Sequence, residues 1–319
     1  MVSYVVRRLL AALPVILLIL VVSFLVLHLA PGDPVTFYIQ GGTGTTEEFV
    51  AAIRESLGLD KPLGVQLALF LGNAVRGNLG YSFYYHDSVA HVIGARMGVT
   101  SLLVFLAVVL ASGGGIVLGV LAGTHPYSTI DRVNTFVAVV GYSIPVFWLG
   151  QLLVLLFAIR LKLLPTGGIP ISALGQGGVG NWARSLVLPV LAVGLMQLAL
   201  IARITRANML EILGADYITA ARAKGLKESV VIFKHALRNA ILPVVTVINL
   251  GLGSLLTGAM VTETVFSWPG LGRMMLDSLL RRDYPVLMGL LIVMSVGVVI
   301  LNLVTDILYV YLDPRIVYR

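Results

Sequence analysis

Residues 209–240 read MLEILGADYITAARAKGLKESVVIFKHALRNA, a basic and weakly apolar segment within an otherwise hydrophobic sequence. Apolar runs border this segment at 186–202 and 241–261, and each is long enough to approach a bilayer span. The segment is therefore expected at a membrane surface. Its density of lysine and arginine favours the cytoplasmic side, because positive charge in short loops is retained inside.

The composition of the whole chain indicates a polytopic membrane protein. Hydrophobic residues make up 58% of the sequence and charged residues 12%, with a mean hydropathy of +0.97, whereas soluble domains are about 25% charged. The net charge of +7 does not favour nucleic acid, because the basic residues flank apolar runs. The absence of cysteine excludes disulfides and thiolate metal sites.

The order of apolar runs predicts a single all-α membrane domain with both termini in the cytoplasm. The expected membrane-spanning helices are 9–29, 99–123, 133–159, 186–207, 241–262 and 286–311. A polar insert at 31–96 follows the first of them and is expected outside the membrane, with its own helix starting near Pro62 and ending before Gly77. Pro145 is expected to kink the third span.

A stripe of small residues predicts one close helix contact. Ala111, Gly115, Gly119 and Gly123 recur at intervals of four in the second span, so they share one helix face. Association of helices in lipid relies on such close packing, and the contact is expected either within the subunit or between subunits.

Two short helices are predicted within 209–240. Asp216 is a suitable N-cap and Gly225 a left-handed stop, which predicts a helix over 217–224 with thin, alanine-rich walls able to enter a groove on a partner. A second helix over 227–239 combines an apolar face with a basic stripe. It is expected to lie on the membrane surface.

At this point the sequence resembles the transmembrane permease subunit of ABC importers, in the dipeptide, oligopeptide and nickel branch. That family carries a cytoplasmic Glu-Ala-Ala motif followed at fixed spacing by a glycine, and Thr219-Ala220-Ala221 with Gly225 match it, Thr219 replacing the acid. Further motifs of the branch are HLAPGDPV from His28, GNLGYS from Gly77, ETVFSWPGLG from Glu263 and LDPR from Leu312.

The resemblance implies a type I ABC importer permease fold of about six helices in a bacterial or archaeal inner membrane. It implies as partners a second homologous permease subunit, two cytoplasmic ATPase subunits and an external substrate-binding protein, with peptide as substrate. The chain has no phosphate-binding G-x-x-x-x-G-K-[ST] loop, so ATP and Mg are expected in the partner subunits. No catalytic, cofactor or metal site is expected in this chain.

Two groups of functional residues are expected. The ATPase-coupling residues implied by the resemblance are Asp216, Tyr217, Thr219, Ala220, Ala221, Arg222, Lys224 and Gly225. The candidate pathway or gate residues are Thr246, Asn249, Thr257 and Glu263. The three polar residues within the span could instead bond helix to helix, and Glu263 could be a satisfied interfacial acid.

Three other functions remain open. One is a permease of the same family for nickel or another small solute. A self-sufficient secondary carrier and a structural membrane scaffold come from other classes. Few ionisable residues lie deep in the spans, which disfavours a proton-coupled carrier. Stoichiometric co-purification of ATPase subunits separates the importer from both rivals.

Overall fold

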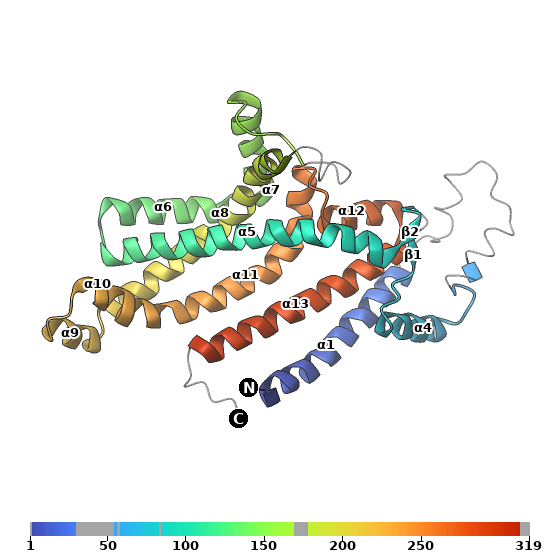
Figure 1. The fold of residues 1–319 in the computed structure, drawn as a ribbon, viewed down its shortest axis with the longest axis horizontal. Coiled ribbons are helices and arrows are strands. Elements are labelled where there is room, and N and C mark those ends of the chain that lie inside the picture. Colours follow the sequence, from blue (N-terminus) through green and yellow to red (C-terminus); the bar gives the residue numbers. More distant parts are fainter. Residues whose placement is uncertain (1, 30–53, 56–57, 83, 169–177, 313–319) are drawn as a thin grey trace. The chain divides into compact units, whose positions relative to one another are not determined.

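The structure is a computed structural model that describes residues 2–29, 54–55, 58–82, 84–168 and 178–312 (Figure 1). The chain divides into two compact units, which are described separately. The first consists of Met1–Val99 and Arg273–Leu303, and the second of Thr100–Gly272 and Val304–Arg319. The motif at His28 and the LDPR motif extend beyond the described ranges.

Helices dominate both units. In chain order the elements are α1 (Val2–Leu29), α4 (Leu63–Val75), β1 (Tyr81–Ser82), β2 (Asp87–Ser88), α5 (Val89–Thr124), α6 (Thr129–Ser143), α7 (Val146–Leu153), the π-helical η1 (Val154–Arg160), α8 (Gly178–Leu213), α9 (Asp216–Ala223), α10 (Glu228–Val230), the π-helical η3 (Val231–Ala236), α11 (Leu237–Val265), α12 (Leu271–Arg281) and α13 (Tyr284–Leu312).

Most of the expected spans correspond to long apolar helices. Among the described residues, four helices are long and apolar enough to cross a membrane, or five if the bent pair of α6 with α7 and η1 is one span. The first expected span, 9–29, lies within α1. The fold is that of an all-α membrane protein.

In the second unit, the stripe of small residues brings α5 against α8. A Cβ atom on Gly115 would lie 2.7 Å from Cγ2 of Ile201, and one on Gly119 would lie 2.7 Å from the carbonyl oxygen of Ala202. Only glycine permits this backbone separation. The contact predicted from the spacing is therefore confirmed, and it is formed within the subunit.

An ion pair fixes α6 to the same helix, α8. Arg206 forms a two-point hydrogen bond with Asp131, whose residue is only 3% exposed, and the bond from Nη2 to Oδ2 measures 2.8 Å. Ser128 caps α6 by accepting from the backbone N–H of Asp131. A paired and hydrogen-bonded carboxylate is tolerated inside such a bundle where an unpaired one would not be.

The first unit is organised around a small hairpin. Strands β1 and β2 pair antiparallel, with Tyr81 opposite Ser88. The hydroxyl of Ser82, the last residue of the GNLGYS motif, donates to Oδ2 of Asp283 at 2.5 Å. Burial raises the pKa of the Asp283 carboxyl above its ordinary value, and this hydrogen bond opposes the rise. The motif thus joins two segments that are distant in sequence.

Aromatic contacts complete the first unit. The rings of Phe24 in α1 and Phe70 in α4 stack with centroids 5.8 Å apart. The helix α4 begins after Pro62 and is followed by Gly77 with φ +72°, so the predicted bounds of this helix are confirmed. The guanidinium of Arg281 lies 4.1 Å from the centroid of the Tyr84 ring.

The helices of the structure differ in extent from two of the expected elements. The insert was expected to extend to residue 96, but α5 begins at Val89. The reason is that Val89, Val92 and Ile93 form a buried face at helical spacing with no breaker after them. The interruption expected at Pro145 in the third span is present, as a bend of 107° between α6 and the pair of α7 and η1. Ile144 adopts an extended conformation, as a residue before proline prefers.

The helix predicted over 227–239 begins as expected after Lys227 but does not end at Asn239. Residues from Glu228 onward continue through η3 into α11, and the apolar helix Glu228–Leu252 is itself long enough to span. Val231, Ala236 and Ala240 are buried within the second unit. These three residues pack on protein, whereas Phe233, on the predicted apolar face, is 64% exposed.

Candidate functional site

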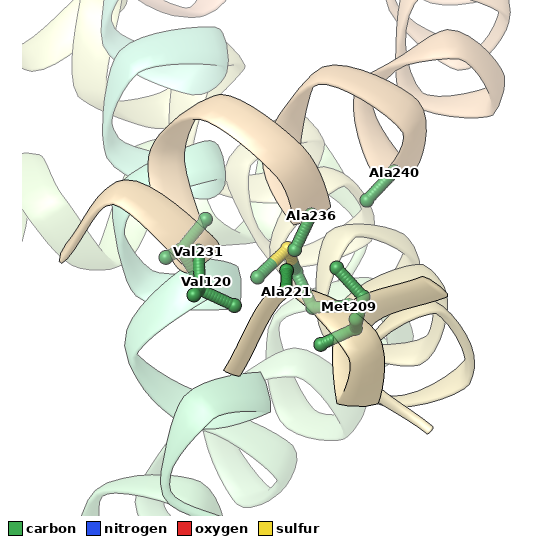
Figure 2. Close-up of a cluster of buried hydrophobic side chains, with 7 residues drawn as sticks. Val120, Met209, Ala221, Val231, Ala236 and Ala240 are labelled. Atoms are coloured by element: carbon green, nitrogen blue, oxygen red, sulfur yellow. The ribbon is translucent and has the colours of Figure 1, made fainter. Parts of the chain in front are cut away.

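The helix α9 is anchored on the second unit by a compact apolar cluster. Ile218 and Ala221 of α9 pack with Met209 of α8, Val120 of α5 and Val231 of η3. Figure 2 shows Ala221 among these side chains, beside Ala236 and Ala240. Ile218 is fully buried. The buried face of α9 is therefore packed against residues of three other helices.

The opposite face of α9 is exposed. Every predicted coupling residue except one lies on the exposed side, namely Asp216, Tyr217, Thr219, Ala220, Arg222, Lys224 and Gly225. Ala221 is the exception, since it is only 7% exposed and belongs to the anchoring cluster. Ala221 shares a helix face with Ile218 at a spacing of three, so its side chain points into the subunit, and its role in coupling stays a prediction.

The ends of α9 differ in part from the prediction. Ala215 occupies the N-cap position and makes no side-chain cap, so the assignment of Asp216 as N-cap is wrong. Asp216 lies in the first turn instead, where its charge complements the helix dipole. Gly225 follows the helix with φ +76°, as predicted for a left-handed stop.

Two polar contacts position α9 against the segment that follows. Arg222 donates twice to the Glu228 carboxylate, at 2.7 and 3.2 Å, and this hydrogen bonding raises the pKa of the Arg222 guanidinium. The Tyr217 hydroxyl accepts from Nδ2 of Asn239 in α11 at 2.8 Å. The α9 segment is therefore held at both ends as well as along its buried face.

The predicted pathway residues divide among different environments. Thr246 is exposed, and its hydroxyl donates to the carbonyl of Leu242 in its own helix at 3.4 Å. Asn249 accepts a hydrogen bond from Thr305 of α13 at 2.8 Å, so it joins two helices. The side chain of Thr257 lies outside the described residues.

Glu263 is fully buried and does not lie on an exposed surface. Its Oε1 accepts from the hydroxyl of Thr100 at 2.6 Å, and Thr100 in turn accepts from the backbone N–H of Leu271 at 2.8 Å. Its carbonyl accepts from the N–H of Trp268 at 2.7 Å. Thr100 was missed because a lone threonine in an apolar run gives no signal of a partner 163 residues away.

Glycine is required where the ETVFSWPGLG loop passes Glu263. A Cβ on Gly270 would lie 2.1 Å from Oε1 of Glu263 and 2.4 Å from the Thr100 hydroxyl. The helix α7 packs closely against the same loop, because a Cβ on Gly150 would lie 3.1 Å from the ring of Phe266. Among the residues that the structure describes, no group of three or more His, Asp or Glu could hold a metal ion.

Comparison with known proteins gives two family matches. Residues 115–318 match the family of binding-protein-dependent transport system inner membrane components, and residues 1–104 match the N-terminal family of such membrane components.

Curated relatives match over the whole chain. The oligopeptide transport system permease protein AppB of Bacillus subtilis is 40% identical, with 100% of each chain covered. The dipeptide transport system permease protein DppB of Escherichia coli is 39% identical, again with 100% of each chain covered. The glutathione transport system permease protein GsiC of Escherichia coli is 39% identical with the same coverage.

A solved structure of the MetNI methionine ABC transporter in inward-facing conformations shares the fold. The TM-score is 0.55 at 18% identity, with 70% of this chain and 96% of that chain covered.

Proposed function

The chain belongs to the family of binding-protein-dependent transport system inner membrane components, and on this premise we propose that it is a permease subunit of an ATP-driven peptide importer. The relatives that match it from end to end are named for oligopeptide, dipeptide and glutathione transport. Their common chemistry is a short peptide. The chain would form half of the translocation pathway beside a second homologous permease subunit.

In this proposal α9 is the coupling contact with a cytoplasmic ATPase. The observation that carries it is the division of α9 into a buried face and an exposed side on which small and charged residues alternate. Exposed Ala220 and Thr219 allow the helix to enter a groove, while buried Ile218 and Ala221 transfer its movement to α5 and α8. ATP and Mg would be bound by two ATPase subunits, and an extracytoplasmic binding protein would deliver the peptide.

The proposed topology follows from the same contact. A cytoplasmic α9 places the basic residues 222–238 inside, in agreement with the positive-inside rule. Both termini would then lie in the cytoplasm of a bacterial or archaeal cell. The exposed side of α9 would carry Lys224 and Arg222 toward the ATPase, which makes the contact sensitive to salt.

The test is co-purification of the complex and its ATP-dependent peptide uptake after reconstitution. Ala220→Trp should abolish recovery of the ATPase subunits, because the indole would fill the groove contact. Ala95→Trp is the matched control, since Ala95 is also an exposed helical alanine but lies in α5 of the other unit. Uptake by the chain without ATPase subunits, or normal ATPase recovery with Ala220→Trp, would contradict the proposal.

A further inference from the structure

One face of the pair α8 and α11 is left open in the second unit. The other faces of α8 pack against neighbouring helices. Thr205 lies against Gly119 of α5, Ala199 against Gly141 of α6, and Gln197 against Gly251 of α11. The remaining face has helical spacing, and its residues are Met196, Leu200, Arg203, Ala207 and Glu211. The last three are exposed and the first two half-buried.

The neighbouring helix α11 has an equivalent open face. Gly251 points toward α8, and Asn249 toward α13 through its bond with Thr305. The exposed residues recur at intervals of four and three, and they are Asn239, Pro243, Thr246 and Leu250. Figure 1 shows α8 and α11 lying side by side. At about 100° per residue, each open face lies about 80–110° before the residue that contacts the other helix, Gln197 on α8 and Gly251 on α11. Because the two helices run antiparallel, these equal offsets place both faces on the same side of the pair.

The chemistry of this α8–α11 face does not suit lipid. It carries a cation, Arg203, and an anion, Glu211, separated by eight positions, which corresponds to about 12 Å along a helix. Thr246 adds a polar group, whereas Asn239 at the end of this face is engaged with the Tyr217 hydroxyl of α9. The exposed face of α6, in contrast, is apolar: Phe136, Val133 and Val139 are 69%, 55% and 54% exposed. Arg203 lies within the expected span 186–207, where a charged side chain normally faces a bundle interior or a water-filled path, and Glu211 lies just beyond the end of that span.

We propose that the α8–α11 face is a wall of the translocation pathway, with Arg203 contacting the carboxylate and Glu211 the ammonium group of a peptide in transit. A peptide at neutral pH carries one charge of each sign at its two ends, which matches a wall with one charge of each sign. The inference rests on the proposed function, because it takes peptide as the substrate. It replaces Asn249 and Glu263 as wall residues, since both are engaged in helix contacts.

The first experiment uses the absence of cysteine from the native chain. Thr246→Cys and Ala207→Cys are labelled in the reconstituted complex with a membrane-impermeant thiol reagent, and Phe136→Cys is the matched exposed control. Labelling of the first two, with protection by a transported peptide and little labelling of the control, is expected. The pathway assignment would be overturned if Thr246→Cys reacts in none of the nucleotide states. It would also be overturned if this cysteine cross-links to the second permease subunit.

The second experiment tests the charges through the termini of the peptide. Uptake is measured for a free peptide, its C-terminal amide and its N-acetylated form. The same binding protein is used throughout, so the preference of the binding protein is the same for every permease variant and cancels when the variants are compared. Arg203→Gln should reduce the discrimination against the amide by about fivefold, the effect of roughly 1 kcal/mol for a partly exposed charge pair. Glu211→Gln should reduce the discrimination against the acetylated peptide in the same way.

Two controls make the result specific. Arg203→Lys should restore discrimination in part, and Arg132→Gln removes another exposed arginine, on α6, without changing it. Unchanged discrimination in Arg203→Gln and Glu211→Gln, with normal wild-type uptake, would overturn the assignment of these residues alone. A wild-type complex that imports no peptide would instead remove the proposed function.

Discussion

The hydroxyl of Thr100 lies between two partners from the far part of the chain, donating to Glu263 at 2.6 Å and accepting from the N–H of Leu271 at 2.8 Å. It therefore joins α5 to the end of α11 and to the start of α12 at one buried point. A buried carboxyl that loses a donor is destabilised more than the mean strength of a hydrogen bond suggests.

Thr100→Val should lower the free energy of unfolding by about 1–3 kcal/mol, because Glu263 and the Leu271 N–H each lose a buried partner. The measurement is thermal unfolding of the purified protein in detergent. Thr264→Val is the control, since Thr264 is exposed and its hydroxyl donates only to Met260 in its own helix. Equal effects of the two substitutions would contradict the role assigned to Thr100.

Gly119→Ala should destabilise the second unit by about 1–3 kcal/mol, as overpacking of a close contact does. The added Cβ would lie 2.4 Å from Cβ of Thr205 and 2.7 Å from the carbonyl of Ala202. Gly113→Ala is matched to it, since no atom lies within 4 Å of the added carbon there. The comparison is made by thermal unfolding, and a loss of stability in Gly113→Ala alone would refute the packing argument.

Gly225→Val should uncouple peptide uptake from ATP hydrolysis. No atom lies within 4 Å of its Cβ position, so the effect arises from the positive φ of +76°, which costs about 1–3 kcal/mol in a non-glycine residue. The ratio of peptide imported to ATP hydrolysed is measured in proteoliposomes. Gly225→Asn should retain most of the coupling, because asparagine tolerates this conformation; equal coupling in both variants would exclude the backbone explanation.

Asp283→Asn should remove a pH dependence of stability. Because burial raises the pKa of Asp283, the folded state binds the proton more tightly than the unfolded state. Stability is therefore greatest at low pH and falls as pH rises from the ordinary carboxyl pKa to the raised one. Unfolding profiles from pH 4 upward should show this fall in the wild type and a smaller one in Asp283→Asn.

Ser82→Ala provides the complementary measurement at the same site. The Ser82 hydroxyl donates to the ionised carboxylate and partly offsets burial, so its loss should raise the pKa of Asp283 further. The fall in stability should then extend to higher pH. A profile that moves in the opposite direction would show that the hydroxyl accepts from a protonated Asp283 instead.

Local patterns in the sequence determined the features that depend on neighbouring residues. The hydrophobic runs predict long membrane helices because a bilayer requires continuous apolar length, and the spacing of Gly115, Gly119 and Gly123 predicts one narrow helix face. Gly225 marks a left-handed stop for the same local reason, since its backbone conformation is decided by steric freedom at one residue. The resemblance to importer permeases, based on the residues around Gly225, is confirmed by the family match.

Only the tertiary structure decided which partner each side chain meets. Ala220 and Ala221 are neighbouring alanines of the same motif, but Ala221 packs beside Ile218 while Ala220 remains exposed. The segment after Lys227 has the pattern of a separate short helix, yet Val231 and Ala236 pack in the apolar cluster and the segment continues into α11. Thr100 and Glu263, like Ser82 and Asp283, meet across long separations in the chain. Burial and long-range hydrogen bonds depend on how helices pack, and the periodicity of one segment contains no information on its neighbour.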